Sequence, residues 1–518
     1  MSKLPRIALR SSRVIRLNSD PTNSGMRVAR QLSKENLAML TDLYQFTMMQ
    51  GYLVNGCQNK QAVFDVFFRD LPFKGGYVLA AGLEQVVEYI ENLTFDEEDL
   101  AYLKSLNLFK EDFIEELRTF RFTGDIDAIP EGTPVFPFEP LIRVKGRIME
   151  TQLFEPAILN LVNFESLIAT KASRVMTAAR GGPVMEFGLR RAQGPDAGVL
   201  GARAAFIGGC QSTSNVLAGR RYGIPVSGTQ AHSWIQCFPS ELEAFRAYAR
   251  AFPDKCLLLV DTYSVLESGV PNAIKVGLEL EAKGHRFQGI RLDSGDLTYL
   301  SRAARRMLDD AGLKSAIIVG SNDLDEETIY AIKAQGAAID AWGVGTSLIT
   351  SKDSPSLGGV YKLAAEGERD VFHPRLKVSE NTSKITNPGI KKVVRFYDQA
   401  GKAMADLIAL ENEVFDEEKP LTIFDPEQTW KRKTLENFRT RELLVPVFRG
   451  GKRVYDLPKL EAVQAYARAE LDTFWDEVKR LSNPHTYTVD LSTDLFELKQ
   501  QLLLTIQQDI KANNKDRG

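Results

Sequence analysis

The sequence predicts an α/β fold built on a parallel sheet, because strand-like and helix-like segments alternate from about residue 152 to 363. Each short apolar segment ends on a cluster of small or polar residues, which is typical of a strand reaching the edge of a sheet. Their number favours a closed barrel over an open sheet. The predicted strands are 184–188, 204–207, 224–226, 256–260, 290–292, 316–319 and 339–342.

Helical patterns fill several of the gaps between these strands. Ser240 with Glu243 fits a capping box that opens a helix. Farther along, four apolar residues recur at helical spacing, and Gly312 can end that helix. These four are Leu297, Leu300, Ala304 and Leu308.

The regions on either side have a different pattern. Before residue 150, Phe64, Val66 and Phe68 alternate with polar partners as in a half-buried strand, and 82–91 and 96–120 have helical patterns. This part is predicted to be an α+β domain at 35–150, followed by the barrel at 151–365.

The C-terminal region, 366–518, contains two further helix-like stretches at 457–481 and 493–511 and is predicted to be mainly accessory. At the other end, residues 1–34 hold six arginines but a single acid, Asp20. A disordered basic extension is the preferred interpretation of 1–34, with a mitochondrial targeting segment as the alternative.

Composition excludes several classes of protein. The 518 residues include 65 Lys and Arg against 68 Asp and Glu, a net charge of −3, which argues against a general nucleic-acid or membrane-surface binder. The four cysteines form no CxxC pair, and no apolar run approaches the length of a membrane span. We therefore expect a soluble, cytoplasmic protein.

The strongest candidate for chemistry is His232, which follows a predicted strand by a few residues and is flanked by Thr229 and Ser233. A neutral imidazole at a strand end can act as a base or as a nucleophile toward phosphorus. The alternative interpretation is a buried histidine with satisfied hydrogen bonds. Four histidines in the whole chain do not easily build a multi-histidine metal site, so the metal ligands stay unassigned.

Other strand ends carry groups suited to anions. Arg190 follows one predicted strand, and a second carries Arg291 and Asp293 on one face. Gly345 and Thr346 offer backbone N–H groups and a hydroxyl ahead of a possible helix, which suits phosphate. Each cluster also has a structural interpretation: a solvated basic face, an internal salt bridge or a tight glycine turn. Together the clusters point to a phosphorylated sugar as substrate, without fixing the reaction.

Several longer motifs identify a family that the chain resembles, the nicotinate phosphoribosyltransferases. The similarity runs in order from about residue 36 to near 505. The motifs are TDLYQFTM at 41–48, FFRDLPFKGGY at 67–77, EFGLRRAQGPD at 186–196, GTQAHSW at 228–234, RLDSGDL at 291–297, GVGTSL at 343–348, VYKL at 360–363, KVSEN and KITNPG between 377 and 389, and PHTYTVDLS at 484–492. One departure is Asp196-Ala197-Gly198, where the family usually has Asp-Gly-Gly.

The resemblance implies a type II phosphoribosyltransferase fold: an irregular α/β barrel with a discontinuous N-terminal α+β domain, on which part of the C-terminal region packs. It implies joining nicotinate to 5-phosphoribosyl 1-diphosphate, giving nicotinate mononucleotide and diphosphate, with coupled ATP hydrolysis and Mg²⁺. This reaction is the entry of nicotinate into NAD salvage. Nicotinamide phosphoribosyltransferase, a sugar-phosphate aldolase or isomerase, and a non-catalytic sensor of the sugar diphosphate remain alternatives.

The resemblance also suggests residue roles. His232 matches a transiently phosphorylated histidine, Thr229 and Arg291 match nicotinate contacts, and Thr346 matches a contact to the sugar phosphate. Tyr44, which spacing alone assigns to a helix core, matches a nicotinate contact that reaches in from a neighbouring subunit. A homodimer with shared active sites is therefore expected.

Overall fold

The computed structural model describes residues 36–369, 371–381 and 384–515. The extension predicted at 1–34 lies outside them. Within the described part, six parallel strands form one sheet in the order β7-β6-β11-β10-β9-β8. Along the chain these strands are β6 (Val184–Glu186), β7 (Ser212–Thr213), β8 (Leu257–Leu259), β9 (Gly289–Leu292), β10 (Ile317–Gly320) and β11 (Ala341–Val344). The predicted parallel α/β arrangement is confirmed, with β7 and β8 at the two ends of the hydrogen-bonded order.

Two predicted strands are wrong. Residues 204–207 form the last turn of a helix, α7, because small apolar residues can be buried on a helix as well as in a strand. Residues 224–226 contribute an isolated bridge from Val226 to Thr213 rather than a strand. The short strand β7 was missed because Ser212 and Thr213 carry no apolar signal.

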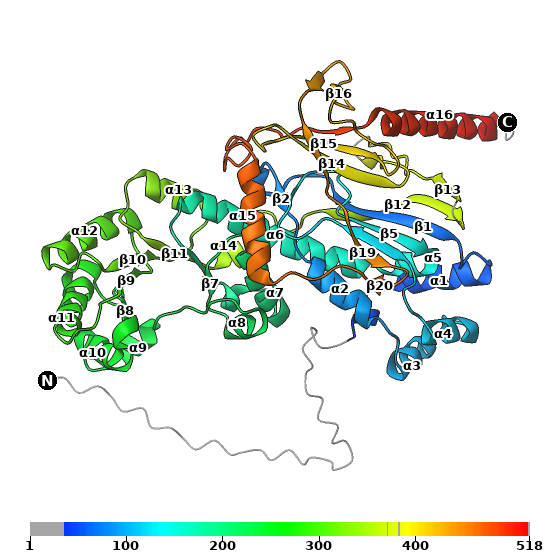
Figure 1. The fold of residues 1–518 in the computed structure, drawn as a ribbon. Helices are drawn as coiled ribbons and strands as arrows, with labels where there is room; N and C mark the ends of the chain where they lie inside the picture. Colours follow the sequence, from blue (N-terminus) through cyan, green and yellow to red (C-terminus); the bar gives the residue numbers. More distant parts are fainter. Residues whose placement is uncertain (1–35, 370, 382–383, 516–518) are drawn as a thin grey trace, which may run out of the picture. The chain divides into compact units, whose positions relative to one another are not determined.

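Helices connect and cover these strands (Figure 1). Ser240 caps the N-terminus of α10 by accepting from the Glu243 amide, which is one half of the predicted capping box. α12 ends just before Gly312, as predicted. The helices of this region are α7 (Pro195–Ile207), α8 (Val216–Tyr222), α9 (His232–Gln236), α10 (Glu241–Ala251), α11 (Val270–Glu281), α12 (Leu297–Asp310), α13 (Glu326–Ala334) and α14 (Thr346–Ile349).

A second, seven-stranded sheet combines the N-terminal and C-terminal parts of the chain in the order β13-β12-β1-β5-β3-β19-β20, with antiparallel neighbours. The domain boundary expected at 365 falls inside β12. The strands are β1 (Gln61–Phe68), β3 (Asp125–Ala128), β5 (Ile142–Arg147), β12 (Gly359–Glu368), β13 (Val371–Pro374), β19 (Val445–Arg449) and β20 (Lys452–Arg453).

The N-terminal helices pack beside this sheet. The stretch predicted as one helix at 96–120 is two helices, because Asn107 adopts a positive φ of 56° between them. The elements are α1 (Leu43–Val54), α2 (Leu83–Asn92), α3 (Glu97–Ser105), α4 (Glu111–Arg118) and α5 (Ile148–Leu153), with the short pair β2 (Val78–Leu79) and β4 (Pro134–Val135). The long helix α6 (Glu155–Ala179) supplies buried residues to both large apolar cores and thus joins the two sheets.

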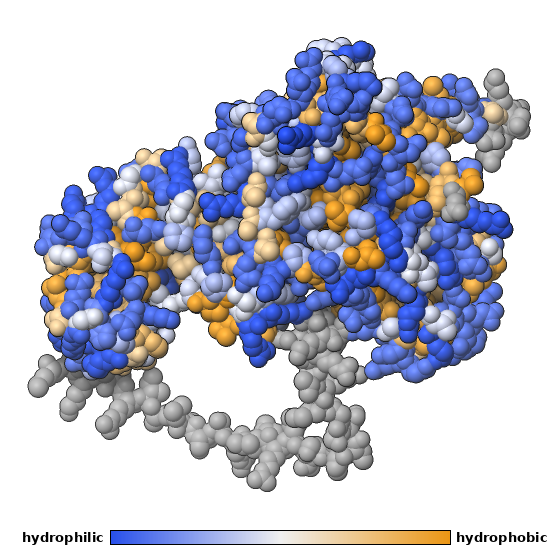
Figure 2. Space-filling view, viewed as in Figure 1, coloured by the Kyte–Doolittle hydropathy of each residue, from blue (hydrophilic) through white to orange (hydrophobic). Residues whose placement is uncertain are grey.

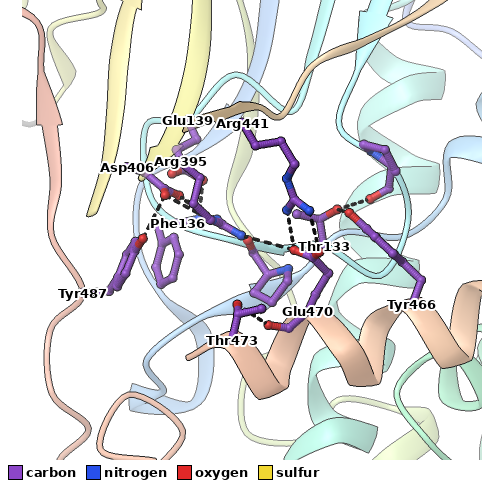
Figure 3. Close-up of polar contacts among 12 residues, drawn as sticks. Thr133, Phe136, Glu139, Arg395, Asp406, Arg441, Tyr466, Glu470, Thr473 and Tyr487 are labelled. Atoms are coloured by element: carbon purple, nitrogen blue, oxygen red, sulfur yellow. Dashed lines mark hydrogen bonds and ion pairs between the residues drawn. The ribbon is translucent and has the colours of Figure 1, made fainter. Parts of the chain in front are cut away.

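A four-stranded sheet in the order β18-β14-β15-β21 completes the C-terminal region, with a separate hairpin of β16 and β17. A buried polar network around Arg395 is one of its connections to the rest of the fold (Figure 3). The elements are β14 (Lys391–Tyr397), β15 (Ala403–Leu410), β16 (Leu421–Phe424), β17 (Arg432–Leu435), β18 (Arg439–Glu442), β21 (Val489–Leu491), α15 (Leu460–Thr473) and α16 (Thr493–Lys515).

Hydrophobic side chains on the face shown in Figure 2 lie in small groups between hydrophilic ones. Among the described residues, no helix is both long enough and apolar enough to span a bilayer.

Candidate active site

Polar side chains gather where the strands of the parallel sheet end. Because β6, β8, β9, β10 and β11 run parallel, the residues that follow them meet at one edge of the sheet. The loop before α9 carries Thr229 to the same edge, and His232 begins α9 there. The site is built on this edge.

Arg291, the third residue of β9, is the centre of the cluster. Its Nη2 donates to Asp293 Oδ1 at 2.8 Å, its Nη1 to Thr229 Oγ1 at 3.2 Å, and its Nε to Ser321 Oγ at 2.8 Å. The guanidinium also lies 5.5 Å from the centroid of the Phe187 ring. Three strand ends and the loop before α9 therefore converge on one cation beside an aromatic face.

His232 is the first residue of α9 and remains partly open, with 42% of its side chain exposed. Its Nδ1 lies 3.2 Å from Thr262 Oγ1, and its Nε2 lies 3.8 Å from Asp293 Oδ2. The Thr262 contact engages one ring nitrogen and leaves the other facing the Arg291–Asp293 pair. Such an imidazole can accept a proton or a phosphoryl group at its second nitrogen.

The carboxylate of Asp261 follows β8 and lies beside this group. Its Oδ2 accepts from Ser294 Oγ at 2.5 Å, whereas its Oδ1 is buried and has no hydrogen-bond partner among the described residues. A buried carboxylate oxygen without a partner is costly unless a ligand or ion completes it. Asp261 is therefore a candidate for contact with a hydroxyl or a cation.

Glu186, the last residue of β6, supports the turn that presents Phe187. Its carboxylate accepts from Thr213 Oγ1 at 2.6 Å and from the Gly188 amide. Burial raises the pKa of Glu186 above its usual value, and these two donors oppose the shift. On the other side of the ring, a Cβ on Gly343 would come within 2.6 Å of Phe187, so only glycine leaves room for it.

Gly345 and Thr346 join β11 to α14 at the same edge. Gly345 has φ −118° and ψ −98°, and Thr346 is the first residue of the helix. Both are only partly buried, as a phosphate contact requires. The structure places this turn next to Phe187, since a Cβ on Gly345 would lie 3.2 Å from the Phe187 carbonyl oxygen.

Two predicted site residues do not join the cluster. Arg190 is exposed in a short 3-10 turn after β6 and makes no contact with Arg291, Asp293 or His232. Tyr44 is 45% exposed on α1, and its hydroxyl donates to Glu155 at 3.4 Å. Figure 1 shows α1 and α9 in separate parts of the fold.

The cluster also contains residues that were not predicted as site residues. Ser321 and Thr262 hold Arg291 and His232 respectively, and Phe187 lies against the guanidinium. All three lie just after strands of the parallel sheet: Phe187 after β6, Ser321 after β10 and Thr262 a few residues after β8. That position was the available signal, but the residue types alone do not distinguish them from ordinary turn residues.

Comparisons with known proteins point to one family. The family described as "Nicotinate phosphoribosyltransferase (NAPRTase) family" matches residues 183–365, its N-terminal domain matches 39–163, and its C-terminal domain matches 390–499. The nicotinate phosphoribosyltransferase of Bacillus subtilis is 46% identical over 478 residues, covering 92% of this chain and 97% of that protein. The human enzyme of the same name is 35% identical over 523 residues, covering 90% and 96%.

Solved structures give the same result. The crystal structure of human nicotinic acid phosphoribosyltransferase matches with a TM-score of 0.77 at 33% identity, over 90% of this chain and 100% of that one. A nicotinate-nucleotide pyrophosphorylase from Pyrococcus furiosus shares the fold, with a TM-score of 0.65 at 22% identity over 86% and 98%. These matches confirm the type II phosphoribosyltransferase fold class. The chain belongs to the nicotinate phosphoribosyltransferase family and is an enzyme of the glycosyltransferase type.

Proposed function

We propose that this enzyme joins nicotinate to 5-phosphoribosyl 1-diphosphate, forming nicotinate mononucleotide and diphosphate for NAD salvage. The observation that carries the proposal is Arg291, a half-buried cation held by Thr229 and Asp293 against the Phe187 ring. A carboxylate on a planar ring suits a guanidinium better than an uncharged amide does. The names of the relatives support the same substrate.

In this reaction the pyridine nitrogen forms a bond to C1 of the ribose, and the bond from C1 to the diphosphate oxygen breaks. Positive charge builds on the sugar and negative charge on the leaving group. Asp293 is placed to hold a ribose hydroxyl, and the amides after β11 at Gly345 and Thr346 to hold the 5-phosphate. Holding both reactants in line supplies much of the catalysis.

We further propose that ATP phosphorylates His232. The imidazole nitrogen bonds to the terminal phosphorus of ATP, and the bond to the ADP oxygen breaks. The engagement of Nδ1 by Thr262 assigns the acceptor role to Nε2. The added phosphate brings nearly two negative charges beside Arg291 and Asp293, which reorganises the site for the sugar diphosphate; later hydrolysis resets it.

Labelled ATP tests this step. The terminal phosphate should give an acid-labile label on the wild-type protein and none on His232→Ala. A label that persists in His232→Ala would refute the assignment. His285→Ala is the control, because His285 pairs with Asp254 away from the site and its loss should leave labelling intact.

Mg²⁺ fits the donors present. No group of three or more His, Cys, Asp or Glu side chains among the described residues could hold a metal alone. The ion would therefore be held by Asp261, whose buried Oδ1 lacks a partner, together with oxygens of the diphosphate. Bound there, Mg²⁺ would neutralise charge on the leaving diphosphate.

A homodimer with shared sites explains why Tyr44 lies away from His232. Leu43, Tyr44 and Met48 expose an apolar face of α1, at 51%, 45% and 41% respectively. A second copy covering this face would bring Tyr44 to the partner's site, where its ring can stack on nicotinate. Mixed dimers of Tyr44→Ala and His232→Ala chains should recover up to half the wild-type activity. Mixed dimers as inactive as the parents would refute sharing.

We place the enzyme in the cytoplasm, because all four cysteines are unpaired, as is usual for proteins of a reducing compartment. The decisive assay for the reaction is detection of nicotinate mononucleotide and diphosphate, with nicotinate and nicotinamide compared, each with and without ATP. We expect preference for nicotinate and a higher rate with ATP. Preference for the amide would favour nicotinamide phosphoribosyltransferase, and binding without product would favour a sensor.

A further inference from the structure

The parallel sheet ends at β7 on one side and at β8 on the other. The segment 225–230 lies against both of these outer strands. At the β7 edge, Thr213 N donates to Pro225 O at 3.0 Å, and Ser227 N donates to Thr213 O at 3.0 Å. The hydroxyls of Ser212 and Ser227 add a contact of 2.7 Å. The segment 225–227 is therefore held beside β7 by an isolated parallel bridge from Val226 to Thr213.

The same segment reaches the β8 edge three residues later, but with a side chain. Gln230 is 7% exposed. With its amide oriented to match the groups around it, its nitrogen donates to Leu257 O at 2.9 Å and its oxygen accepts from Leu259 N at 3.3 Å. These backbone groups point away from β9, because Val260 N and Cys256 O are the neighbours that pair with the β9 side.

We propose that Gln230 is a positioning residue: its amide takes the place of the missing strand pairing between 225–230 and β8, and so sets the loop that carries Thr229 and His232. Thr229 comes directly before it and meets Arg291. His232 comes two residues after it and meets Thr262, which follows β8 itself. The loop and β8 thus run side by side, with Gln230 fixing their register.

An amide is the side chain this position requires. One polar end must donate to a carbonyl and the other must accept from an N–H, at a buried position. Without it, the two β8 groups lose their partner and the loop keeps only its attachment to β7. The contacts of Thr229 and His232 would then no longer be held together.

The test compares Gln230→Met with Gln464→Met. Gln464 is a matched control, because its side chain also donates to two backbone groups, Phe206 O at 2.6 Å and Cys210 O at 2.9 Å, outside the site. Both variants lose buried hydrogen bonds. In Gln230→Met we expect labelling of His232 by ATP to slow at least tenfold and the KM for nicotinate to rise at least fivefold. With ATP left out, so that phosphorylation of His232 plays no part, the KM for the sugar diphosphate, held at the β11 turn, should stay within twofold.

A purely structural role gives a different pattern, a lower fraction of active protein with all KM values unchanged in both variants. That pattern, or equal behaviour of the two variants, would overturn the proposal. Hydrogen exchange supplies a readout that needs no activity: the Leu259 amide should exchange at least tenfold faster in Gln230→Met only. Unchanged exchange at Leu259 would also overturn it.

Gln230→Glu adds a rescue experiment. A neutral carboxylic acid can donate to Leu257 O and accept from Leu259 N, whereas the ionised form cannot donate. Activity of Gln230→Glu relative to wild type should therefore rise as pH falls, and a flat ratio would count against the amide's role. The kinetic readouts rest on the proposed function. If wild type lacks activity, that function fails, while the exchange experiment still decides the role of Gln230.

Discussion

Arg291 and Arg395 each pair with an aspartate, at 2.8 Å and 2.6 Å, yet their surroundings differ completely. Arg395 and Asp406 are fully buried, and Arg395 Nη2 also donates to Pro134 O. Figure 3 shows the pair enclosed by Tyr487, Phe136 and Glu470 from separate parts of the chain. Arg291 instead has a 16% exposed side chain and Asp293 a 29% exposed one.

The ion-pair distance therefore does not separate structural charges from functional ones. The difference lies in whether polar atoms of the cluster can be reached by a ligand. Asp406 accepts from Arg395 and Tyr487 and is closed from solvent, so no ligand can reach it. Around Arg291, His232 Nε2 is open and Asp261 Oδ1 has no partner among the described residues. A charge cluster with unfinished hydrogen bonds at an open edge is suited to a ligand.

The largest expected effect follows from replacing the fully buried Arg395. Arg395→Met would leave Asp406 as a buried charge without a cation, so the free energy of unfolding should fall by about 3–5 kcal/mol. Urea titration measures this. Arg395→Met combined with Asp406→Asn should recover part of the loss. Arg246→Met, which breaks an exposed pair with Glu279, should change the free energy of unfolding far less. Equal losses for both single variants would contradict the comparison.

Replacing the partly exposed Arg291 should lower activity rather than stability. Arg291→Gln is expected to lower kcat/KM for nicotinate about 100-fold, or about 2.7 kcal/mol. Its Tm should stay within about 3 °C of wild type, since the cluster is partly solvated. The control is Arg305→Gln, which loses contacts to Asp309, Leu313 and Ala316 on α12 and its flanking turn but lies outside the site. If Arg305→Gln loses as much activity as Arg291→Gln, the role of Arg291 is refuted.

The open cluster was also the part that sequence predicted best. Arg291 lies in a predicted strand, and Thr229, His232 and Asp293 follow predicted strands. They were expected near one another because parallel strands end at one edge of a sheet. Arg190 follows a strand too, but it is exposed in the short 3-10 turn after β6. Strand-end position fixes proximity, while the direction of a side chain depends on the turn that follows.

The closed network could not have been predicted in this way. Its members come from residue 134, β14, β15, α15 and the segment before β21, and nothing local marks them as neighbours. The missed strand β7 has the same cause: two polar residues become a strand only because β6 and Val226 lie on either side of them. Residues 204–207 failed for the opposite reason, because an apolar run fits a helix equally well.

The closed network should also respond to pH. Burial, and next the Asp406 carboxylate, raise the pKa of Glu139 well above its usual value. As pH rises past about 4.5, the unfolded chain releases this proton while the folded protein keeps it, so Glu139 lowers stability with rising pH. Glu139→Gln removes this loss while keeping an N–H donor toward Asp406. Its stability advantage over wild type should therefore grow from pH 5 to pH 7.

Urea titrations at both pH values measure this difference. Exposed Glu436→Gln is the control and should follow wild type at both pH values. A Glu139→Gln protein whose advantage is the same at pH 5 and pH 7 would show that Glu139 does not retain its proton on folding.

The smallest expected effect concerns the Thr262 hydroxyl, which lies against the His232 ring. Thr262→Val removes the hydroxyl oxygen that lies 3.2 Å from His232 Nδ1 and keeps the shape of the residue. One hydrogen bond contributes about 1 kcal/mol, so labelling of His232 by ATP should slow about fivefold. Stability should hardly change, since the exposed side of the ring can bond to water. Thr505→Val, which loses a hydroxyl on α16, should label at the wild-type rate. An unchanged rate in Thr262→Val would mean that packing of the ring alone, rather than the hydrogen bond at Nδ1, presents Nε2 to ATP.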